Sequence, residues 1–193
     1  MAIAQIISFL FNPVLLFSFV PLFLVYRTTG DITTAMVWTG YTMIFLLIMA
    51  FFIIYGVQKQ IFTDIDVSNR TQRPLLFIVS FILSFVYLGG LFLLHGPMIL
   101  SLVIGGIIVG IVLVSIINTR IKASIHVATI SALIFALAFV YNGWYLLLLL
   151  FIPLVAWARL KVNRHTLQET IVGAALGILL SLGLYFVIKF IYS

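Results

Sequence analysis

The sequence predicts an all-α membrane protein, a polytopic transmembrane bundle of six to seven helical spans. Hydrophobic residues make up 65% of its 193 residues and charged residues only 7%, against about 25% in an average soluble domain. The mean hydropathy is +1.36, and a bilayer can cover this much apolar surface whereas a soluble core of this length cannot. We therefore expect a single transmembrane domain over residues 1–193 in the cell membrane, surrounded by membrane lipids.

Charged residues divide the chain into apolar segments, each near the ~20 residues that cross a bilayer. The segments run approximately over residues 3–26, 34–57, 74–94, 97–118, 125–141, 144–157 and 170–188. The first lacks the basic start of a signal peptide, so we expect a retained spanning helix. The alternative is a re-entrant segment broken at Pro13. The fifth and sixth segments are the shortest, which leaves the number of spans at six or seven.

Short polar turns separate several segments and favour antiparallel helical hairpins. They lie at residues 28–31, 95–97 and 141–143. We interpret His95 as a turn residue without a chemical role. Two runs, 106–110 and 173–177, have glycines four positions apart, which lets helices approach closely. We expect them to pack inside the bundle, with a homodimer face as the alternative.

Charge is concentrated in three loops, and two apolar segments separate each loop from the next. Because an even number of spans lies between them, we expect all three loops on the same membrane face as the N-terminus. The loops 58–73, 119–124 and 158–169 hold eight of the ten Lys and Arg residues. The net charge of +6 therefore suits anionic headgroups or an anionic substrate, and no long basic stripe indicates nucleic acid. The Lys and Arg excess favours the cytoplasmic side, but a phosphate site would itself require several of these cations. The chain has no cysteine, which excludes thiol chemistry.

The third loop carries the most informative pattern. His165 and Glu169 are four residues apart, so one helical face brings imidazole and carboxylate within hydrogen-bonding distance. A carboxylate fixes the tautomer of a working imidazole, and Arg159 is suited to hold an anion beside it. Thr166 and Glu169 also fit a capping box that closes the start of the last helix. The capping box leaves Arg159 and His165 unexplained, and the two interpretations can coexist.

The other loops add cations, a serine and a second histidine. Ser124 can cap the next helix and leave its positive end facing the loop, with His126 in the first turn and Lys122 beside it. This combination suits oxyanion binding and proton transfer. Arg70 and Arg73 are three apart, and planar guanidinium groups suit phosphate. The alternatives are an ordinary helix cap and interfacial anchoring by the arginines.

Together these residues predict a phosphate site without a metal or cofactor. Cations would offset the phosphate charge while one histidine attacks phosphorus and the other protonates the leaving oxygen. Asp64 and Asp66 are the other acids of the three loops, and an oxygen-rich metal site usually needs more carboxylates.

In their order along the chain, these residues resemble the phosphatidic acid phosphatase type 2 and haloperoxidase superfamily. Its three motifs are K-x6-R-P, P-S-G-H and S-R-x5-H-x3-D. The chain has Asp66-x6-Arg73-Pro74, Ala123-Ser124-Ile125-His126 and Ala158-Arg159-x5-His165-x3-Glu169. The resemblance covers about residues 64–177, inside a motif-bearing core of about 58–188.

The resemblance implies a metal-independent phosphatase that works through a phosphohistidine. It implies that His165 is the nucleophile, that Glu169 orients it, and that His126 protonates the leaving alkoxide. It implies that the phosphate is held by Arg73, Arg159, Ser124 and nearby backbone N–H groups. The family's first-motif lysine is replaced here by Asp66, and Lys122 or Arg70 is the candidate replacement cation. Ile125 stands where the family has glycine.

The leading expectation is a membrane lipid phosphatase. Its substrate would be a phosphomonoester or diphosphate on a lipid such as phosphatidic acid, phosphatidylglycerophosphate or a polyprenyl phosphate. One alternative is a non-catalytic lipid-phosphate binding or transport protein, which the replacements at Asp66 and Ile125 favour. Another is a Mg²⁺-dependent intramembrane prenyltransferase that uses Asp64 and Asp66.

Overall fold

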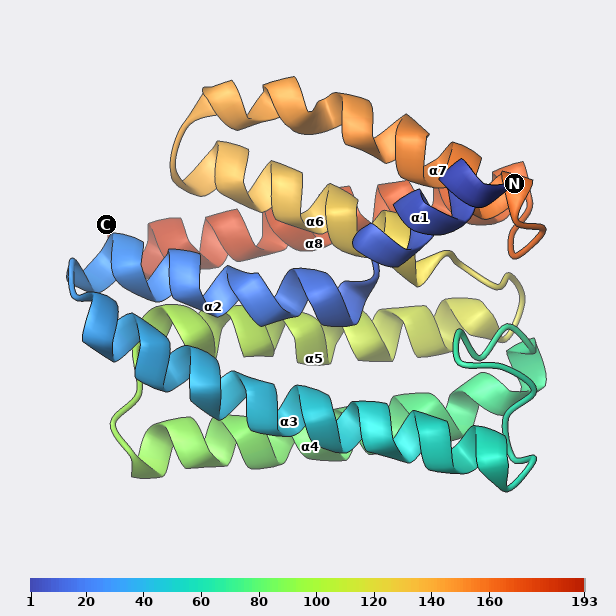
Figure 1. Cartoon of the computed structure of the whole chain (residues 1–193). Helices are drawn as coiled ribbons and strands as arrows, with labels where there is room; N and C mark the ends of the chain where they lie inside the picture. The colour runs from blue at the N-terminus through green and yellow to red at the C-terminus, as the bar shows by residue number, and fades with distance from the viewer. Residues whose placement is uncertain (193) are drawn as a thin grey trace. The chain divides into compact units, whose positions relative to one another are not determined.

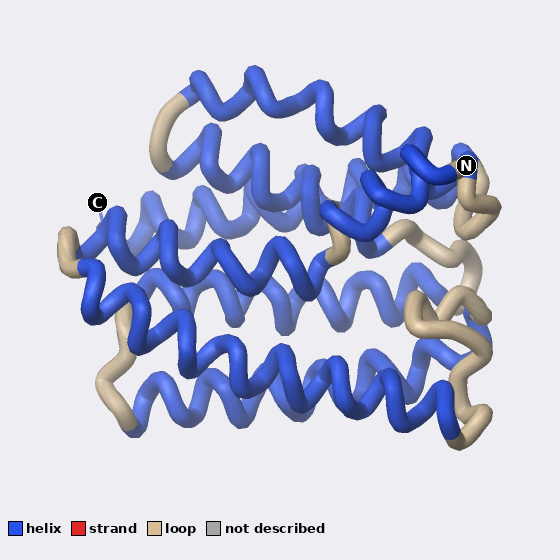
Figure 2. The backbone as a smooth tube through the Cα atoms, in the orientation of Figure 1, coloured by secondary structure: helices blue, strands red, loops and turns tan. Residues whose placement is uncertain are grey.

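The computed structural model describes residues 1–192, which form helices joined by turns and loops, with no strand in that range (Figures 1 and 2). The predicted all-α class is therefore confirmed. The elements are α1 (Ala2–Leu10), α2 (Pro13–Thr29), α3 (Ile32–Gln58), η1 (Arg70–Gln72), α4 (Arg73–Leu93), α5 (Met98–Asn118), α6 (Ile125–Val140), η2 (Gly143–Leu150), α7 (Phe151–Lys161) and α8 (Leu167–Tyr192), where η marks 3₁₀ helix.

Five helical stretches of the described chain are long and apolar enough to cross a membrane. They are Ile32–Gln58, Arg70–Leu93, Met98–Asn118, Gly143–Lys161 and Leu167–Ile191. The broken pair α1 and α2 raises the number to six if it is counted as one span. α6 has 16 residues, or roughly 24 Å of helix against a hydrocarbon core of ~30 Å, so it falls short of a full span. The described chain thus has five stretches, or six with the broken pair, that are long and apolar enough to span, and the expected number of six to seven spans stays a prediction.

The break in the first segment lies where Pro13 opens α2. Proline has no N–H to donate and is tolerated in a first helical turn, but it cannot continue the preceding helix. α1 accordingly ends at Leu10, and the N–H of Phe11 bonds the carbonyl of Ile7 at 3.0 Å. The single helix expected over 3–26 is therefore wrong, and the alternative break at Pro13 is what the structure has. Pro21 lies inside α2 without ending it.

The chain forms two compact units. Residues Val14–Ser115 form one, called here the α2–α5 unit. Met1–Pro13 and the chain from Ile116 onward form the other, called the α6–α8 unit. The sequence-based expectation of one domain over the whole chain stays a prediction.

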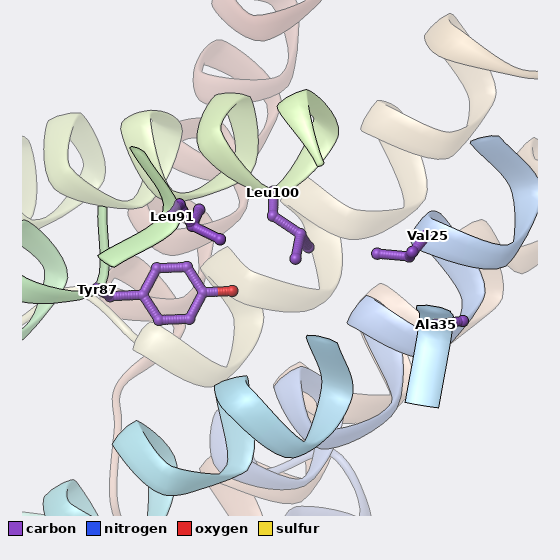
Figure 3. Close-up of a cluster of buried hydrophobic side chains, with 5 residues drawn as sticks. All are labelled: Val25, Ala35, Tyr87, Leu91 and Leu100. Carbon is purple, nitrogen blue, oxygen red and sulfur yellow. The ribbon is translucent and has the colours of Figure 1, made fainter. Parts of the chain in front are cut away.

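The α2–α5 unit has a small apolar core, in which a hydrogen bond between Tyr41 and Tyr87 joins two helices. Five buried side chains meet in it, namely Val25, Ala35, Tyr87, Leu91 and Leu100 (Figure 3). The Tyr41 hydroxyl donates to the carbonyl oxygen of Tyr87 at 2.8 Å, which ties α3 to α4. His95 closes the α4–α5 turn with a positive φ of 53°, so its interpretation as a turn residue fits its backbone.

The α6–α8 unit is built on a very close crossing of α6 and α8. A Cβ added at Gly173 would lie 2.5 Å from the carbonyl oxygen of Ser124, and Gly177 lies equally tight against the backbone of Ala128. Ser181 extends the seam by donating to the carbonyl of Ala132 at 2.8 Å. The predicted packing role of the 173–177 run is confirmed. Gly106 differs, because a Cβ there would meet no atom within 4 Å.

Candidate phosphate site

The second and third polar loops converge at one end of the α6–α8 unit, where α7 gives way to α8 and α6 begins (Figure 1). The backbone N–H of Ser124 donates to the carbonyl of Glu169 at 3.0 Å. The Lys122 ammonium donates to the carbonyl of Arg164 at 2.7 Å. These two bonds fix the loop before α6 against the loop before α8, so residues more than forty positions apart share one small region.

His165 and Glu169 form the pair that their spacing predicts. Nδ1 of His165 lies 2.8 Å from Oε2 of Glu169, and the histidine is only 8% exposed. The same carboxylate oxygen accepts the backbone N–H of Thr166 at 3.1 Å, and the Glu169 N–H donates to the Thr166 hydroxyl at 3.3 Å. The capping box and the His–Glu pair therefore coexist, and the cap holds the carboxylate where the imidazole needs it.

Lys122 lies against the same carboxylate. Its ammonium is 3.8 Å from Oε2 of Glu169, and both side chains are largely covered. Its shorter bond is the one to the Arg164 carbonyl. Lys122 is thus engaged with the loop and with Glu169, which makes it a support of the His165–Glu169 pair as well as a candidate phosphate ligand.

Ser124 occupies the N-cap position of α6, as predicted, but its side chain makes no capping hydrogen bond. The residue is fully buried, and its hydroxyl oxygen has no hydrogen-bond partner in the described chain. A buried hydroxyl at the positive end of a helix is well suited to an anionic ligand. His126 follows in the first turn of α6 and is 7% exposed.

Arg159 is almost completely buried near the C-terminal end of α7, at 2% exposure. Its backbone carbonyl accepts the N–H groups of Arg164 and His165 at 3.1 and 3.3 Å, which turns the chain back toward α8. Nη1 of Arg159 donates to the hydroxyl of Ser8 at 2.6 Å. Ser8 lies on α1, which packs against α7.

Sequence reasoning missed Ser8. One signal for it was present: Ala4 and Ser8 are small residues four apart in an otherwise bulky apolar segment, and both are buried. A stripe of small residues of this kind is typical of a helix face that packs closely on a neighbouring helix.

The first polar loop belongs to the α2–α5 unit and is organised by its own side chains. Arg73 is 3% exposed, and its Nε donates to the carbonyl of Val67 at 3.1 Å. Asp64 accepts the N–H groups of Asp66 and Ser68 at 2.9 and 3.3 Å. These bonds hold the loop before α4 in place, while the phosphate-binding roles of Arg70 and Arg73 stay predictions.

The described residues contain no group of three or more His, Asp or Glu side chains placed to hold a metal ion. Asp64, a ligand in the prenyltransferase alternative, accepts backbone hydrogen bonds in the loop before α4.

No family model matches the chain, and neither a curated protein nor a solved structure matches it.

Proposed function

We propose that the protein is a phosphatase of the cell membrane that hydrolyses a lipid phosphomonoester or diphosphate through a phosphohistidine at His165. The lipid is of the phosphatidic acid, phosphatidylglycerophosphate or polyprenyl phosphate type. The observation that carries the proposal is the buried His165–Glu169 pair, held at 2.8 Å beside the start of α6.

The pair suits nucleophilic catalysis because a carboxylate on Nδ1 fixes the imidazole tautomer. With the Nδ1 proton directed at Glu169, the lone pair of Nε2 is the one that attacks phosphorus. The bond between phosphorus and the lipid oxygen then breaks, and His126 gives that oxygen a proton. Water later attacks the phosphohistidine and gives a proton to His126, so that phosphate is released and both histidines are restored.

Three features of the same unit suit the phosphate oxygens. Arg159 supplies a buried guanidinium, whose planar donors match phosphate geometry. Ser124 supplies a buried hydroxyl without a partner in the described chain. The N-terminus of α6 supplies backbone N–H groups and the positive end of a helix dipole.

A lipid substrate is favoured over a soluble one by the setting of these groups. The α6–α8 unit contains two stretches long and apolar enough to cross a membrane, and His165 and Glu169 lie where the first of them ends and the second begins. A site at the end of a spanning helix meets a headgroup while the tails remain in the hydrocarbon layer.

The test is phosphate release from a panel of lipid phosphates by purified protein in mixed micelles, with a chelator present. We expect turnover by the wild type, inhibition by vanadate, and a loss of roughly 1,000-fold or more in His165→Ala. His95→Asn is the matched control, because asparagine tolerates the positive φ at that turn. Full activity of His165→Ala would refute the mechanism.

The replacement of the family's glycine by Ile125 favours a second candidate, a non-catalytic lipid-phosphate binding or transport protein. A Cβ next to Ser124 restricts the close approach of backbone to phosphate. In the same panel, this candidate predicts saturable binding of a lipid phosphate without phosphate release, and binding that His165→Ala leaves unchanged.

A further inference from the structure

The contact between Ser8 and Arg159 links the first helix of the chain to the candidate phosphate site. Nη1 of Arg159 donates to Oγ of Ser8 at 2.6 Å across 151 sequence positions. Ser8 is 8% exposed and Arg159 2% exposed, so water competes little for this hydrogen bond. A charge-assisted bond in such surroundings is among the stronger polar contacts that a protein makes.

This hydrogen bond also restricts the orientation of the Arg159 guanidinium. A guanidinium group is planar, so fixing one of its terminal nitrogens limits the plane in which its other donors lie. Arg159 has a long side chain with much rotamer freedom to lose. A partner on another helix therefore holds the guanidinium in one orientation before any ligand arrives.

α1 has the shape that this role requires. Ala4, one turn before Ser8, is 1% exposed, and its small side chain allows α1 to lie close against α7. The other side of α1 carries large exposed apolar residues, including Ile3, Ile6 and Phe9. Apolar contacts therefore position α1, and the hydroxyl of Ser8 on its packed face reaches Arg159.

We propose that Ser8 is a positioning residue for Arg159, so that α1 is part of the catalytic apparatus rather than a packing helix alone. The proposal rests on the proposed phosphatase function. It assigns to Ser8 the pre-orientation of a guanidinium that stabilises the charge developing on the transferred phosphoryl group. Pre-orientation of this kind acts mainly in the transition state, so its loss lowers kcat more than it raises KM.

The rival explanation is that the hydrogen bond only fastens α1 to α7. That explanation predicts a lower Tm for Ser8 variants with unchanged kinetics in the folded fraction. The two are separated by an isosteric pair, Ser8→Thr and Ser8→Val, which have nearly the same volume but differ in the hydroxyl.

The experiment measures kcat, KM, vanadate inhibition and Tm for these variants in mixed micelles. We expect Ser8→Thr to keep most of the activity and Ser8→Val to lose roughly 10- to 100-fold in kcat, with weaker inhibition by vanadate. In an Arg159→Lys background, the Thr and Val variants should have equal kcat, because the group being positioned is gone. Ser84→Ala is the control, since it removes a buried serine that bonds the carbonyl of Ser80 within α4.

The negative results distinguish failure of the Ser8 role from failure of the proposed phosphatase function. An active wild type with equal kcat for Ser8→Thr and Ser8→Val overturns the role of Ser8 and leaves the phosphatase proposal standing. A wild type that neither releases phosphate nor binds vanadate overturns both. Should Ser8→Val reduce Tm without changing kcat, α1 is a packing helix and the inference is wrong.

Discussion

At the scale of single residues, Glu169 meets two demands with one carboxylate. Its Oε2 accepts the backbone N–H of Thr166, which satisfies a donor at the start of α8, and it lies 2.8 Å from Nδ1 of His165. A capping role and an orienting role make different demands on chemistry, because a cap needs only an acceptor whereas a phosphohistidine mechanism needs a negative charge.

This difference gives a prediction for Glu169→Gln and Thr166→Ala. Glutamine keeps the capping box but lacks the charge that stabilises an imidazolium, so we expect kcat to fall roughly 100-fold with little change in stability. Thr166→Ala removes the reciprocal cap and should cost about 1 kcal/mol of stability while keeping most of the activity. Phosphate release and thermal unfolding of both variants provide the measurement.

The opposite pattern would contradict the assignment. If Glu169→Gln kept full activity and only the stability of the variants changed, the carboxylate would be a helix cap and His165 would lack an orienting partner. Glu169→Asp serves as the intermediate variant, because it keeps the charge but shortens the reach.

Local pairs of this kind could be predicted from sequence, whereas distant contacts could not. The spacing of His165 and Glu169 is a property of one helical turn, so periodicity alone places them together. The bonds from Lys122 to the Arg164 carbonyl and from Arg159 to Ser8 join different elements. Nothing in the sequence fixes which small residue of an apolar segment meets an arginine 151 positions away.

At the scale of elements, the site depends on how closely α8 approaches the start of α6. Gly173 lies directly against the backbone of Ser124, and a Cβ there would be 2.5 Å from the Ser124 carbonyl oxygen. Carbonyl oxygens of a helix cannot move aside independently, so the helices themselves must separate. The same carbonyl accepts the N–H of Ala128 and forms part of the first turn of α6.

We therefore expect Gly173→Ala to destabilise the protein by about 1–3 kcal/mol and to lower activity more than its stability loss explains. The activity loss follows because Ser124 and His126 would shift away from His165. Gly183→Ala is the matched control on the same helix, since a Cβ there meets no atom within 4 Å. It should be neutral or stabilising by up to about 1 kcal/mol.

Unfolding in detergent and phosphate release, measured for both alanine variants, test this expectation. Equal behaviour of Gly173→Ala and Gly183→Ala would show that α6 and α8 do not require their close crossing.

Element lengths were less predictable than element positions. The seven apolar segments all form helices, but α6 stops at Val140 because Tyr141 and Asn142 begin a turn, in which Asn142 accepts the N–H of Trp144. The first segment breaks because Pro13 fits only the start of a helix. Hydropathy averages over such local breaks, so it finds the apolar segments but not the residues at which their helices begin and end.

At the scale of the whole molecule, the arrangement of charge predicts a transmembrane topology. Eight of ten Lys and Arg residues lie in three loops, and each pair of successive loops is separated by two apolar segments. Loops separated by an even number of crossings lie on the same side. On this count, the turns between α4 and α5 and between α6 and η2 are predicted to face the opposite side, and α6, with 16 residues, is the shortest of the crossings.

The absence of cysteine from the sequence allows a direct test by single-cysteine labelling. We expect Ile65→Cys, Thr119→Cys and Lys161→Cys, all at exposed positions, to react with a membrane-impermeant maleimide from one side of sealed vesicles. Leu94→Cys and Trp144→Cys, also exposed, should react only from the other side. Permeabilised vesicles, in which all five positions should react, control for accessibility of the thiols.

The Trp144 position decides whether α6 crosses the membrane. If α6 and the η2–α7 stretch each cross, Trp144→Cys is labelled from the side opposite Thr119→Cys. If α6 and the η2–α7 stretch instead form a re-entrant hairpin, Trp144→Cys lies at its tip within the bilayer and is not labelled from the side opposite Thr119→Cys. Such a hairpin would still leave residues 119–124 and 158–169 on one face, as their contacts require, but neither of its arms would be a full crossing.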